Sequence, residues 1–420
     1  MRTKYIDLIE QTFDFPQREF QLEEDKLLFH GIDLMDLIEK YGTPLKFNYL
    51  PQISNNIQRC KGWFRDAMNA IGYNGTYNYS YCTKSSHFSF VMDEVLKNNV
   101  NIETSSSYDI DIINHLIDEG KLTGKEQIIC NGFKQDRYIE GIADLINRDF
   151  VEVIPIIDNY DELEKITNLV NKKVKVGIRI ASEEDPKFEF YTSRLGLRYR
   201  NIVPFYNEQI KDNPKVELKM LHFFINTGIQ DNAYYWNELS KSLRVYGELK
   251  TICPELDALN IGGGFPIKKS LAFDYDYEYM VQEIVAQVKH VCKEYKIPAP
   301  NLYTEFGSFT VGECGGAIFK VLDQKQQNDR EKWNMIDSSF MTNLPDTWAI
   351  NQRFVMLPIN RWNENYERVL LGGLTCDSDD YYNSEQHSNA IYLPKFNKDE
   401  PLYIGFFNTG AYQENIGGYG

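Results

Sequence analysis

Between about residue 47 and residue 305, short apolar runs alternate with amphipathic stretches. The runs have the length and β-branched content of buried strands, whereas the stretches between them repeat apolar positions at helical spacing. Eight runs follow this pattern: Thr76–Cys82, Val100–Thr104, Gln127–Asn131, Val151–Ile157, Val174–Ile180, Glu217–Phe224, Leu256–Ile261 and Asn301–Glu305. Eight βα units over roughly 260 residues have the size of a (β/α)8 barrel. We therefore predict a TIM-like barrel over residues 45–310. A doubly wound open sheet is the alternative, although no Gly-x-Gly-x-x-Gly pattern follows an early strand.

Beyond Val311 the helical spacing disappears. Short apolar runs separated by turns continue to the end of the chain: Ala317–Leu322, Phe354–Pro358, Glu367–Leu371 and Pro401–Phe406. This texture is typical of an all-β domain. Residues 1–44 are polar, with a helix expected at Leu34–Lys40, and we expect this segment to complete the β-domain. The predicted fold class is α/β, with a barrel at 45–310 and a β-domain made of 1–44 and 311–420.

Composition narrows the classes of partner. The 420-residue chain has a formal net charge of −16, which argues against nucleic acid or an anionic membrane as the main partner. Its seven cysteines lack CxxC spacing and its six histidines form no metal pattern, so we expect neither a disulfide framework nor a metal site. The first residues show no apolar segment of the signal-peptide type. We therefore expect a soluble, cytoplasmic protein.

A lysine stands at the end of the first predicted strand, in Tyr81-Cys82-Thr83-Lys84. Partial desolvation at such a position favours the neutral amine, which can attack a carbonyl and form a Schiff base. The alternative is an ordinary solvated charge at a strand end. The choice between the two depends on which side chains the other strands bring to the same end of the barrel, where barrel enzymes have their active sites.

Glycines cluster after the last two predicted strands. Gly262, Gly263 and Gly264 follow the seventh strand, and Gly307 and Ser308 follow the eighth. Glycines allow backbone N–H groups to approach a phosphate, and barrels frequently bind phosphate at these two loops. A sharp turn would need the same residues. A phosphate site near a carbonyl-reactive lysine indicates pyridoxal 5′-phosphate (PLP) or a sugar phosphate in an aldolase.

A carboxylate at the end of the eighth strand favours the first of these ligands. Glu305 could keep the pyridine nitrogen of PLP protonated, a function that an aldolase does not need. The alternative is a structural carboxylate paired with Arg179 or Arg194. His222, inside the sixth run, is interpreted as a residue of the core or as one that contacts the ligand-binding side chains without binding the ligand.

The β-domain contains a thiol among several acids. Cys376, Asp377 and Asp380 lie within five residues. A thiol can return a proton to carbon, and the carboxylates can hold a cationic group of a substrate. A solvated acidic turn is the alternative interpretation.

Together these motifs resemble the barrel-type (fold III) PLP-dependent amino-acid decarboxylases, a superfamily that includes ornithine and diaminopimelate decarboxylases. Within it the resemblance is to the biosynthetic arginine decarboxylases, and it extends from about residue 41 to the end of the chain. It rests on six segments in order: Tyr81–Lys84, Ile128–Lys134, Asn260–Phe265, Thr304–Gly307, Thr375–Asp379 and Gly410–Glu414.

The resemblance implies roles for individual residues. Lys84 would bind PLP covalently and Cys376 would return the proton after CO2 leaves. Asp377 and Asp380 would receive the substrate's guanidinium. The remaining cofactor-binding positions would be Phe224, Thr227, Gly262, Gly263, Gly264, Glu305, Gly307, Ser308 and Tyr412.

The expected reaction is the conversion of L-arginine to agmatine and CO2, in polyamine biosynthesis. The family also implies a homodimer in which the Cys376 segment reaches the partner's active site. The same chemistry on diaminopimelate, lysine or a carboxylated polyamine, or an inactive binding protein, is an alternative.

The chain departs from the family at two positions. Phe224 stands where the family usually has a histidine stacked on the cofactor ring, and Ser308 stands where it has an arginine near the phosphate. Phenylalanine can still cover a ring face, and serine can still donate a hydrogen bond without the charge. The family sequence is also expected to continue beyond Gly420.

Overall fold

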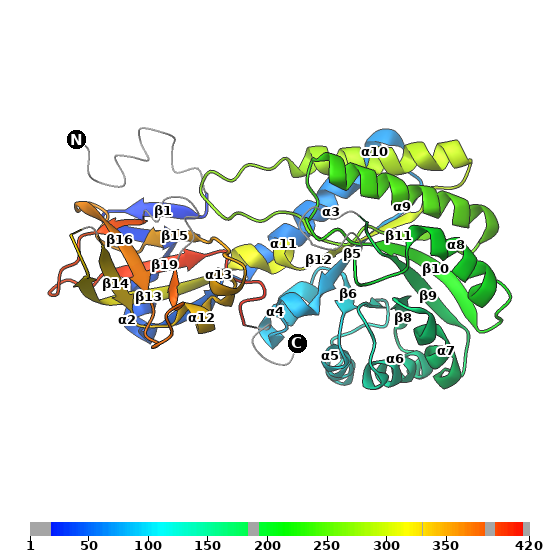
Figure 1. Ribbon diagram of the computed structural model, residues 1–420, viewed down its shortest axis with the longest axis horizontal. Coiled ribbons are helices and arrows are strands. Elements are labelled where there is room, and N and C mark those ends of the chain that lie inside the picture. The colour runs from blue at the N-terminus through cyan, green and yellow to red at the C-terminus, as the bar shows by residue number, and fades with distance from the viewer. Residues whose placement is uncertain (1–17, 184–192, 330, 383–390, 415–420) are drawn as a thin grey trace. The chain divides into compact units, whose positions relative to one another are not determined.

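The structure is a computed structural model that describes residues 18–183, 193–329, 331–382 and 391–414. These residues form two compact units. The barrel unit comprises Leu50–Pro266 and Tyr275–Thr310, and the β unit comprises the chain before residue 50, Ile267–Asp274 and the chain from Val311 onward. Figure 1 shows the order of the elements along the chain. Residues 1–17 and 415–420 of the predicted β-domain, including the end at which the family was expected to continue, lie outside the described residues.

In the barrel unit, eight parallel strands close into a ring in chain order. The last strand pairs with the first, and Glu305 lies opposite Ser80 in that pairing. The predicted barrel is therefore confirmed, and the open doubly wound sheet is wrong because no edge remains. The strands are β5 (Tyr77–Cys82), β6 (Asn101–Thr104), β7 (Gln127–Cys130), β8 (Glu152–Ile157), β9 (Val174–Ile180), β10 (Val216–Phe223), β11 (Ala258–Asn260) and β12 (Asn301–Phe306).

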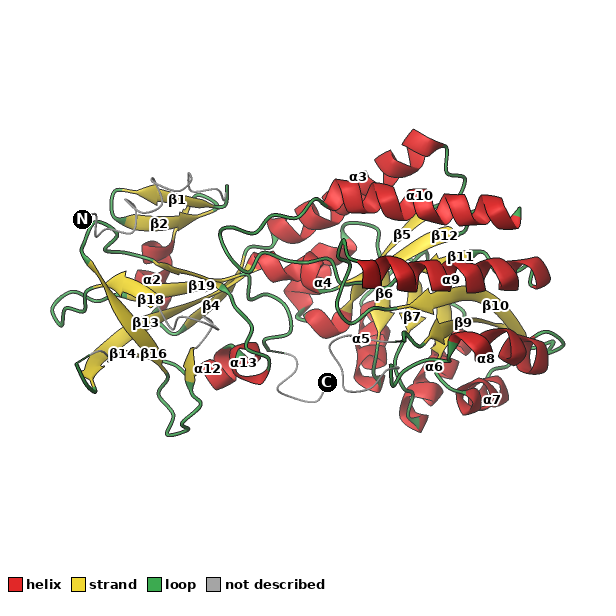
Figure 2. Ribbon diagram, turned by 45° about the horizontal axis from the view of Figure 1, so that its top comes forward, coloured by secondary structure: helices red, strands yellow, loops and turns green. Residues whose placement is uncertain are grey.

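Helices surround these strands, as Figure 2 shows in red and yellow. Ser106 and Asp109 form a reciprocal capping box at the start of α5, and Asn159 and Asn232 cap α7 and α9. Because the caps stand in the loops that follow strands, they fix those loops at the carboxyl end of the barrel. The helical elements are α3 (Pro51–Ile71), η1 (Thr83–Ser85), α4 (Ser89–Leu96), α5 (Ser107–Asp118), α6 (Asp136–Arg148), α7 (Tyr160–Leu169), α8 (Tyr199–Phe205), η2 (Tyr206–Ile210), α9 (Ala233–Ile252), α10 (Tyr277–Tyr295) and α11 (Ser308–Val311).

None of the helices in the described ranges combines the length and the apolar composition needed to cross a membrane. Many apolar side chains are buried inside the fold. Within the barrel unit one buried cluster joins residues of five strands: Ile129, Ile154, Ile156, Met220, Ala258 and Tyr303. This cluster is the packed centre that a barrel of eight strands requires.

A fully buried ion pair fixes the loop after β7. Lys134 Nζ lies 3.1 Å from Glu162 Oε2, and the two side chains are 0% and 3% exposed. The same ammonium donates to the carbonyl oxygens of Gly132 and Ile156. The Glu162 carboxylate also accepts the backbone N–H groups of Lys134 and Asp158. The loop is thereby tied to the end of β8 by charge-assisted hydrogen bonds.

Replacing Lys134 with methionine should lower the free energy of unfolding by about 3 kcal/mol, because the Glu162 charge would remain buried without its partner. Urea unfolding followed by circular dichroism measures the loss. The double variant Lys134→Met, Glu162→Leu removes both charges and should recover part of that stability. Equal stability of Lys134→Met and wild type would contradict the importance of the pair.

The β unit contains an antiparallel three-stranded sheet and a larger sheet in the order β15-β19-β13-β14-β16-β17. In the larger sheet, β18 pairs with β16 and β4 pairs with β13. The smaller sheet consists of β1 (Phe20–Glu23), β2 (Lys26–Phe29) and β3 (Ile32–Asp33), and α2 (Leu34–Tyr41) follows it. The remaining elements are β4 (Leu45–Asn48), η3 (Gly312–Cys314), β13 (Gly315–Gln326), β14 (Lys332–Ile336), α12 (Phe340–Asn343), α13 (Pro345–Ala349), β15 (Val355–Pro358), β16 (Tyr366–Gly372), β17 (Tyr381–Tyr382), β18 (Ile391–Pro394) and β19 (Tyr403–Phe407).

The N-terminal segment completes the larger sheet through β4. Leu45 pairs with Ile318 and Phe47 with Gly316 in antiparallel register. The barrel unit consequently starts at Leu50, five residues after the predicted start at residue 45. The physical reason is that Leu45–Asn48 finds its backbone partners in β13 and not in the barrel.

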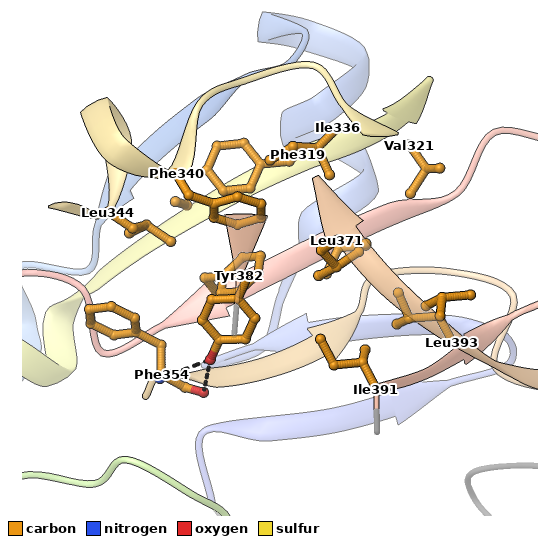
Figure 3. Close-up of a cluster of buried hydrophobic side chains, with 14 of the residues drawn as sticks. Phe319, Val321, Ile336, Phe340, Leu344, Phe354, Leu371, Tyr382, Ile391 and Leu393 are labelled. Atoms are coloured by element: carbon orange, nitrogen blue, oxygen red, sulfur yellow. Dashed lines mark hydrogen bonds between the residues drawn. The ribbon is translucent and has the colours of Figure 1, made fainter. Parts of the chain in front are cut away.

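A buried aromatic and aliphatic cluster holds the β unit together (Figure 3). The Tyr382 ring lies against Phe340 and Phe406, with centroids 5.7 and 4.9 Å away. Its hydroxyl accepts the Phe354 N–H at 3.2 Å and faces the carbonyl oxygen of the same residue at 3.4 Å. A tyrosine is therefore tolerated in the core because its polar end is bonded to backbone.

Candidate active site

Lys84 lies at the carboxyl end of β5, as predicted, in the short turn η1. Three buried hydrogen bonds hold this turn: Tyr81 Oη to Ser86 O at 2.5 Å, Ser85 Oγ to Cys82 O at 2.7 Å and Thr83 Oγ1 to Glu103 O at 3.1 Å. The Lys84 side chain is 41% exposed, and its Nζ donates to Glu103 Oε2 at 2.5 Å. The lysine is thus not a simple solvated charge, because it is paired with a carboxylate inside the barrel.

Glu103 was not assigned a role from the sequence. It stands one residue before the end of β6, adjacent to Cys82 of β5 in the parallel register, and its side chain is fully buried. Burial raises the pKa of Glu103, Lys84 opposes that rise, and the nearby Glu305 adds to it. The available signal was an acid one position before the carboxyl end of a predicted barrel strand, where only a buried partner makes a glutamate tolerable.

Glu305, from β12, is the second buried carboxylate of the site. Its Oε1 accepts from Asn260 Nδ2 at 2.6 Å, and its Oε2 lies 2.9 Å from Asn131 Nδ2 and 3.2 Å from His222 Nε2. Burial alone would raise the pKa of Glu305, but His222, Lys84 and Asn131 together outweigh burial, so the pKa lies below its ordinary value. A carboxylate offers about four acceptor positions. Three are used here, which leaves one for a further N–H donor.

The glycine loop is packed between the ends of β10 and β12. A Cβ atom at Gly263 would lie 2.1 Å from the Glu305 carbonyl oxygen, and one at Gly262 would lie 2.7 Å from the Phe223 carbonyl oxygen. Gly262 and Gly264 also have φ angles of +67° and +106°, which disfavour any other residue. The Gly262 N–H donates to Asn260 Oδ1 and its carbonyl accepts the Glu305 N–H, both at 2.9 Å. The loop therefore needs its glycines for its own geometry.

Several buried polar atoms at this end of the barrel have no hydrogen-bond partner among the described residues. They are Asn131 Oδ1, Arg179 Nε, His222 Nδ1 and Thr227 Oγ1. Orphaned buried polar atoms are costly unless a ligand or water satisfies them. Thr227 and Phe224 follow β10, and the Arg179 guanidinium lies 5.9 Å from the centre of the Phe224 ring. The donors and acceptors present fit a polar, aromatic ligand with an anionic group, as PLP is.

The remaining predicted residues of the barrel unit follow β12. Gly307 is buried and its carbonyl oxygen accepts the Thr310 N–H at 2.9 Å, while Ser308 is the first residue of the four-residue helix α11. Both lie within three residues of Glu305, at the carboxyl end of β12, which pairs with the strand β5 that precedes Lys84. Their binding of a phosphate stays a prediction.

The acidic loop of the β unit follows β16. Cys376 and Asp377 are exposed, whereas Asp380 is buried. Asp380 Oδ1 accepts the Phe340 N–H at 2.8 Å, and its Oδ2 accepts from the Thr375 hydroxyl at 2.7 Å. Asp380 therefore builds the turn that presents Cys376 and Asp377 to solvent, and its contact with a substrate stays a prediction.

Tyr412, also in the β unit, has a left-handed backbone with φ of +65°. Such a conformation costs energy for a residue with a ring side chain and is enriched at functional sites. The next residue, Gln413, is buried and donates to Asp346 Oδ2 at 2.7 Å, which anchors the segment.

Comparison with known protein families identifies the family of this chain. Residues 57–312 match the model of the pyridoxal-dependent decarboxylase family, pyridoxal binding domain. The chain belongs to this family. The pyridoxal-dependent decarboxylases are carboxy-lyases, and their cofactor is PLP, so the fold, the cofactor and the class of reaction expected from the sequence are confirmed.

Curated relatives extend the likeness over most of the chain. The biosynthetic arginine decarboxylase of Geobacter sp. strain M21 is 23% identical, over 92% of this chain and 80% of the relative. The enzyme of the same name from Bacteroides thetaiotaomicron is 22% identical over the same shares.

Solved structures share the fold of this decarboxylase. The biosynthetic arginine decarboxylase SpeA of Campylobacter jejuni superposes with a TM-score of 0.81 at 18% identity, over 97% of this chain and 84% of its own. Diaminopimelate decarboxylase of M. jannaschii gives 0.80 at 20% identity, over 96% and 90%. Lysine decarboxylase of Selenomonas ruminantium gives 0.75 at 17% identity, over 96% and 95%. The fold is thus common to decarboxylases of three different substrates.

Proposed function

We propose that this decarboxylase acts on a basic amino acid, and that L-arginine, converted to agmatine and CO2 for polyamine biosynthesis, is its substrate. The observation that carries the choice is the likeness to curated arginine decarboxylases over 92% of the chain. The exposed carboxylate of Asp377 supports it, because a carboxylate can bind the planar guanidinium through two parallel hydrogen bonds.

In this proposal the barrel unit holds the cofactor. Lys84 binds it through its amine, and Glu305 keeps a proton on the pyridine nitrogen with its remaining acceptor position. Phe224 covers a ring face, and Thr227 Oγ1 is a buried hydroxyl available to the ligand. The glycine loop, Gly307 and Ser308 of the barrel unit hold the phosphate in this proposal, with Tyr412 contributed by a β unit. When bound, PLP supplies an electron sink for the pair of electrons that CO2 leaves behind.

The β unit supplies the substrate side of the proposal. Cys376 Sγ gives a proton to Cα after CO2 has left, and Asp377, with Asp380, binds the distal cation. We further propose that the protein is a homodimer in which this loop serves the partner's site. The exposure of Cys376 and Asp377 in their own unit supports a role for them at another surface.

An assay of CO2 release separates the candidate substrates. Purified protein with PLP is offered L-arginine, L-lysine, meso-diaminopimelate and carboxylated polyamines in parallel. We expect a kcat/KM for arginine at least about 100-fold above the others, because a site built to bind a guanidinium leaves polar groups unpaired with any other side chain. Turnover of diaminopimelate or lysine without arginine would contradict the substrate. No turnover of any of them, with no PLP bound, would favour an inactive relative.

A further inference from the structure

A single asparagine touches both buried acids of the site. Asn131 follows β7, is 4% exposed, and its Nδ2 lies 3.0 Å from Glu103 Oε1 and 2.9 Å from Glu305 Oε2. An amide nitrogen has two N–H donors, which is one for each carboxylate. The amide oxygen has no partner among the described residues, so the contacts with the two acids are those that orient the side chain.

The two acids have different partners on their far sides. Glu103 accepts from Lys84, whereas Glu305 is held by His222 and Asn260. Two carboxylates in one buried space repel each other and could exchange partners if either side chain turned. A neutral double donor between them satisfies one oxygen of each without adding a charge.

We propose that Asn131 is a positioning residue that holds each acid in its own orientation. Glu103 then faces Lys84, and Glu305 faces the ring nitrogen of the cofactor. This inference rests on the proposed roles of Lys84 and Glu305. The pKa values of the two acids also shift in opposite directions. Burial raises the pKa of Glu103, whereas His222, Lys84 and Asn131 together lower the pKa of Glu305 against burial.

The backbone places Asn131 independently of any ligand. Its N–H donates to the Thr104 carbonyl oxygen at 2.9 Å, which continues the β6–β7 pairing by one residue. Gly132 follows with φ of +77°, and Lys134 is tied down by its buried ion pair. The amide is therefore held in place before the cofactor arrives, which is what a positioning residue requires.

The test compares two cofactors in the cofactor-free, full-length protein. One is PLP, and the other is an analogue in which carbon replaces the ring nitrogen, so that Glu305 has no N–H to hold. Dissociation constants are measured by fluorescence for wild type, Asn131→Leu and the control Asn147→Leu, whose amide donates to a backbone carbonyl in an exposed part of the barrel unit. We expect Asn131→Leu to weaken PLP binding about 10-fold more than analogue binding, the usual range for a hydrogen bond to a charged group, because only PLP offers Glu305 an N–H. A change at Glu103 and Lys84 would affect both compounds alike.

The control variant should bind both compounds like wild type. Asn131→Ser, which retains a single donor, should show a smaller difference between the two compounds, with PLP again the more affected. Equal weakening of both compounds, or unchanged PLP binding, would overturn the inference while leaving the proposed function intact. Wild-type protein that binds neither compound would overturn the proposed function itself.

Discussion

Exchange of Lys84 for arginine should reduce kcat for decarboxylation by about 10³-fold or more, the scale seen when a covalent nucleophile is removed. Arginine keeps the positive charge that Glu103 accepts from at 2.5 Å, so the ion pair and the fold should survive. A guanidinium, however, does not lose its proton in proteins and cannot bind the cofactor covalently. Single-turnover CO2 release and borohydride trapping of PLP, read by mass spectrometry, measure the effect.

Lys84→Ala is the informative comparison. It removes the amine and also leaves the fully buried Glu103 without its ammonium partner. We expect it to be as inactive as the arginine variant but less stable, because an uncompensated buried carboxylate is costly. An arginine variant that still traps PLP covalently would show that another lysine is the attachment site.

The Glu305→Gln variant should lower kcat by about 10²- to 10³-fold, the usual loss when one preorganised electrostatic contact of an active site is removed. A neutral amide cannot keep a proton on the pyridine nitrogen as a carboxylate does. Because Glu305 has a pKa below its ordinary value, the wild-type carboxylate is ionised throughout the neutral range. We expect KM to change by less than about 3-fold, since the proposed contact of Glu305 is with the cofactor and not with the substrate.

A matched control exists elsewhere in the barrel unit. Glu238 is another fully buried glutamate, bonded to Tyr199 Oη at 2.9 Å and Lys241 Nζ at 2.9 Å on the outer helix α9. Glu238→Gln should change stability but not kcat. If both variants lowered kcat equally, the loss would reflect folding and not the chemistry of Glu305.

The barrel could be predicted because buried parallel strands leave a simple trace in sequence. Each is a short apolar run with a polar residue near its carboxyl end. Lys84 and Glu305 are two such residues. The contacts between strand ends left no such trace. Asn131 meets Glu305 across 174 positions of chain, and that meeting depends on ring closure and on register, which spacing alone does not encode.

Other parts of the fold could not be predicted from the sequence, for different reasons. The segment Leu45–Asn48 is four residues long, and its pairing with β13 is visible only in the structure. Short strands such as β17 (Tyr381–Tyr382) are too brief for any periodicity. Asp380 looked equivalent to Asp377 in sequence, yet one is buried as a turn-forming residue and the other is exposed.

The close approach at Gly263 links two regions that are usually considered separately. The loop and the strand that carries Glu305 touch backbone to backbone, with no side chain between them to absorb a shift. A displacement of one would therefore move the other, so the backbone itself sets the distance between the proposed phosphate-binding loop and the proposed ring-binding carboxylate. Adaptation to a new substrate would then have to arise in residues away from this junction. The barrel could change its amino-acid substrate while the proposed cofactor-binding residues stay in place.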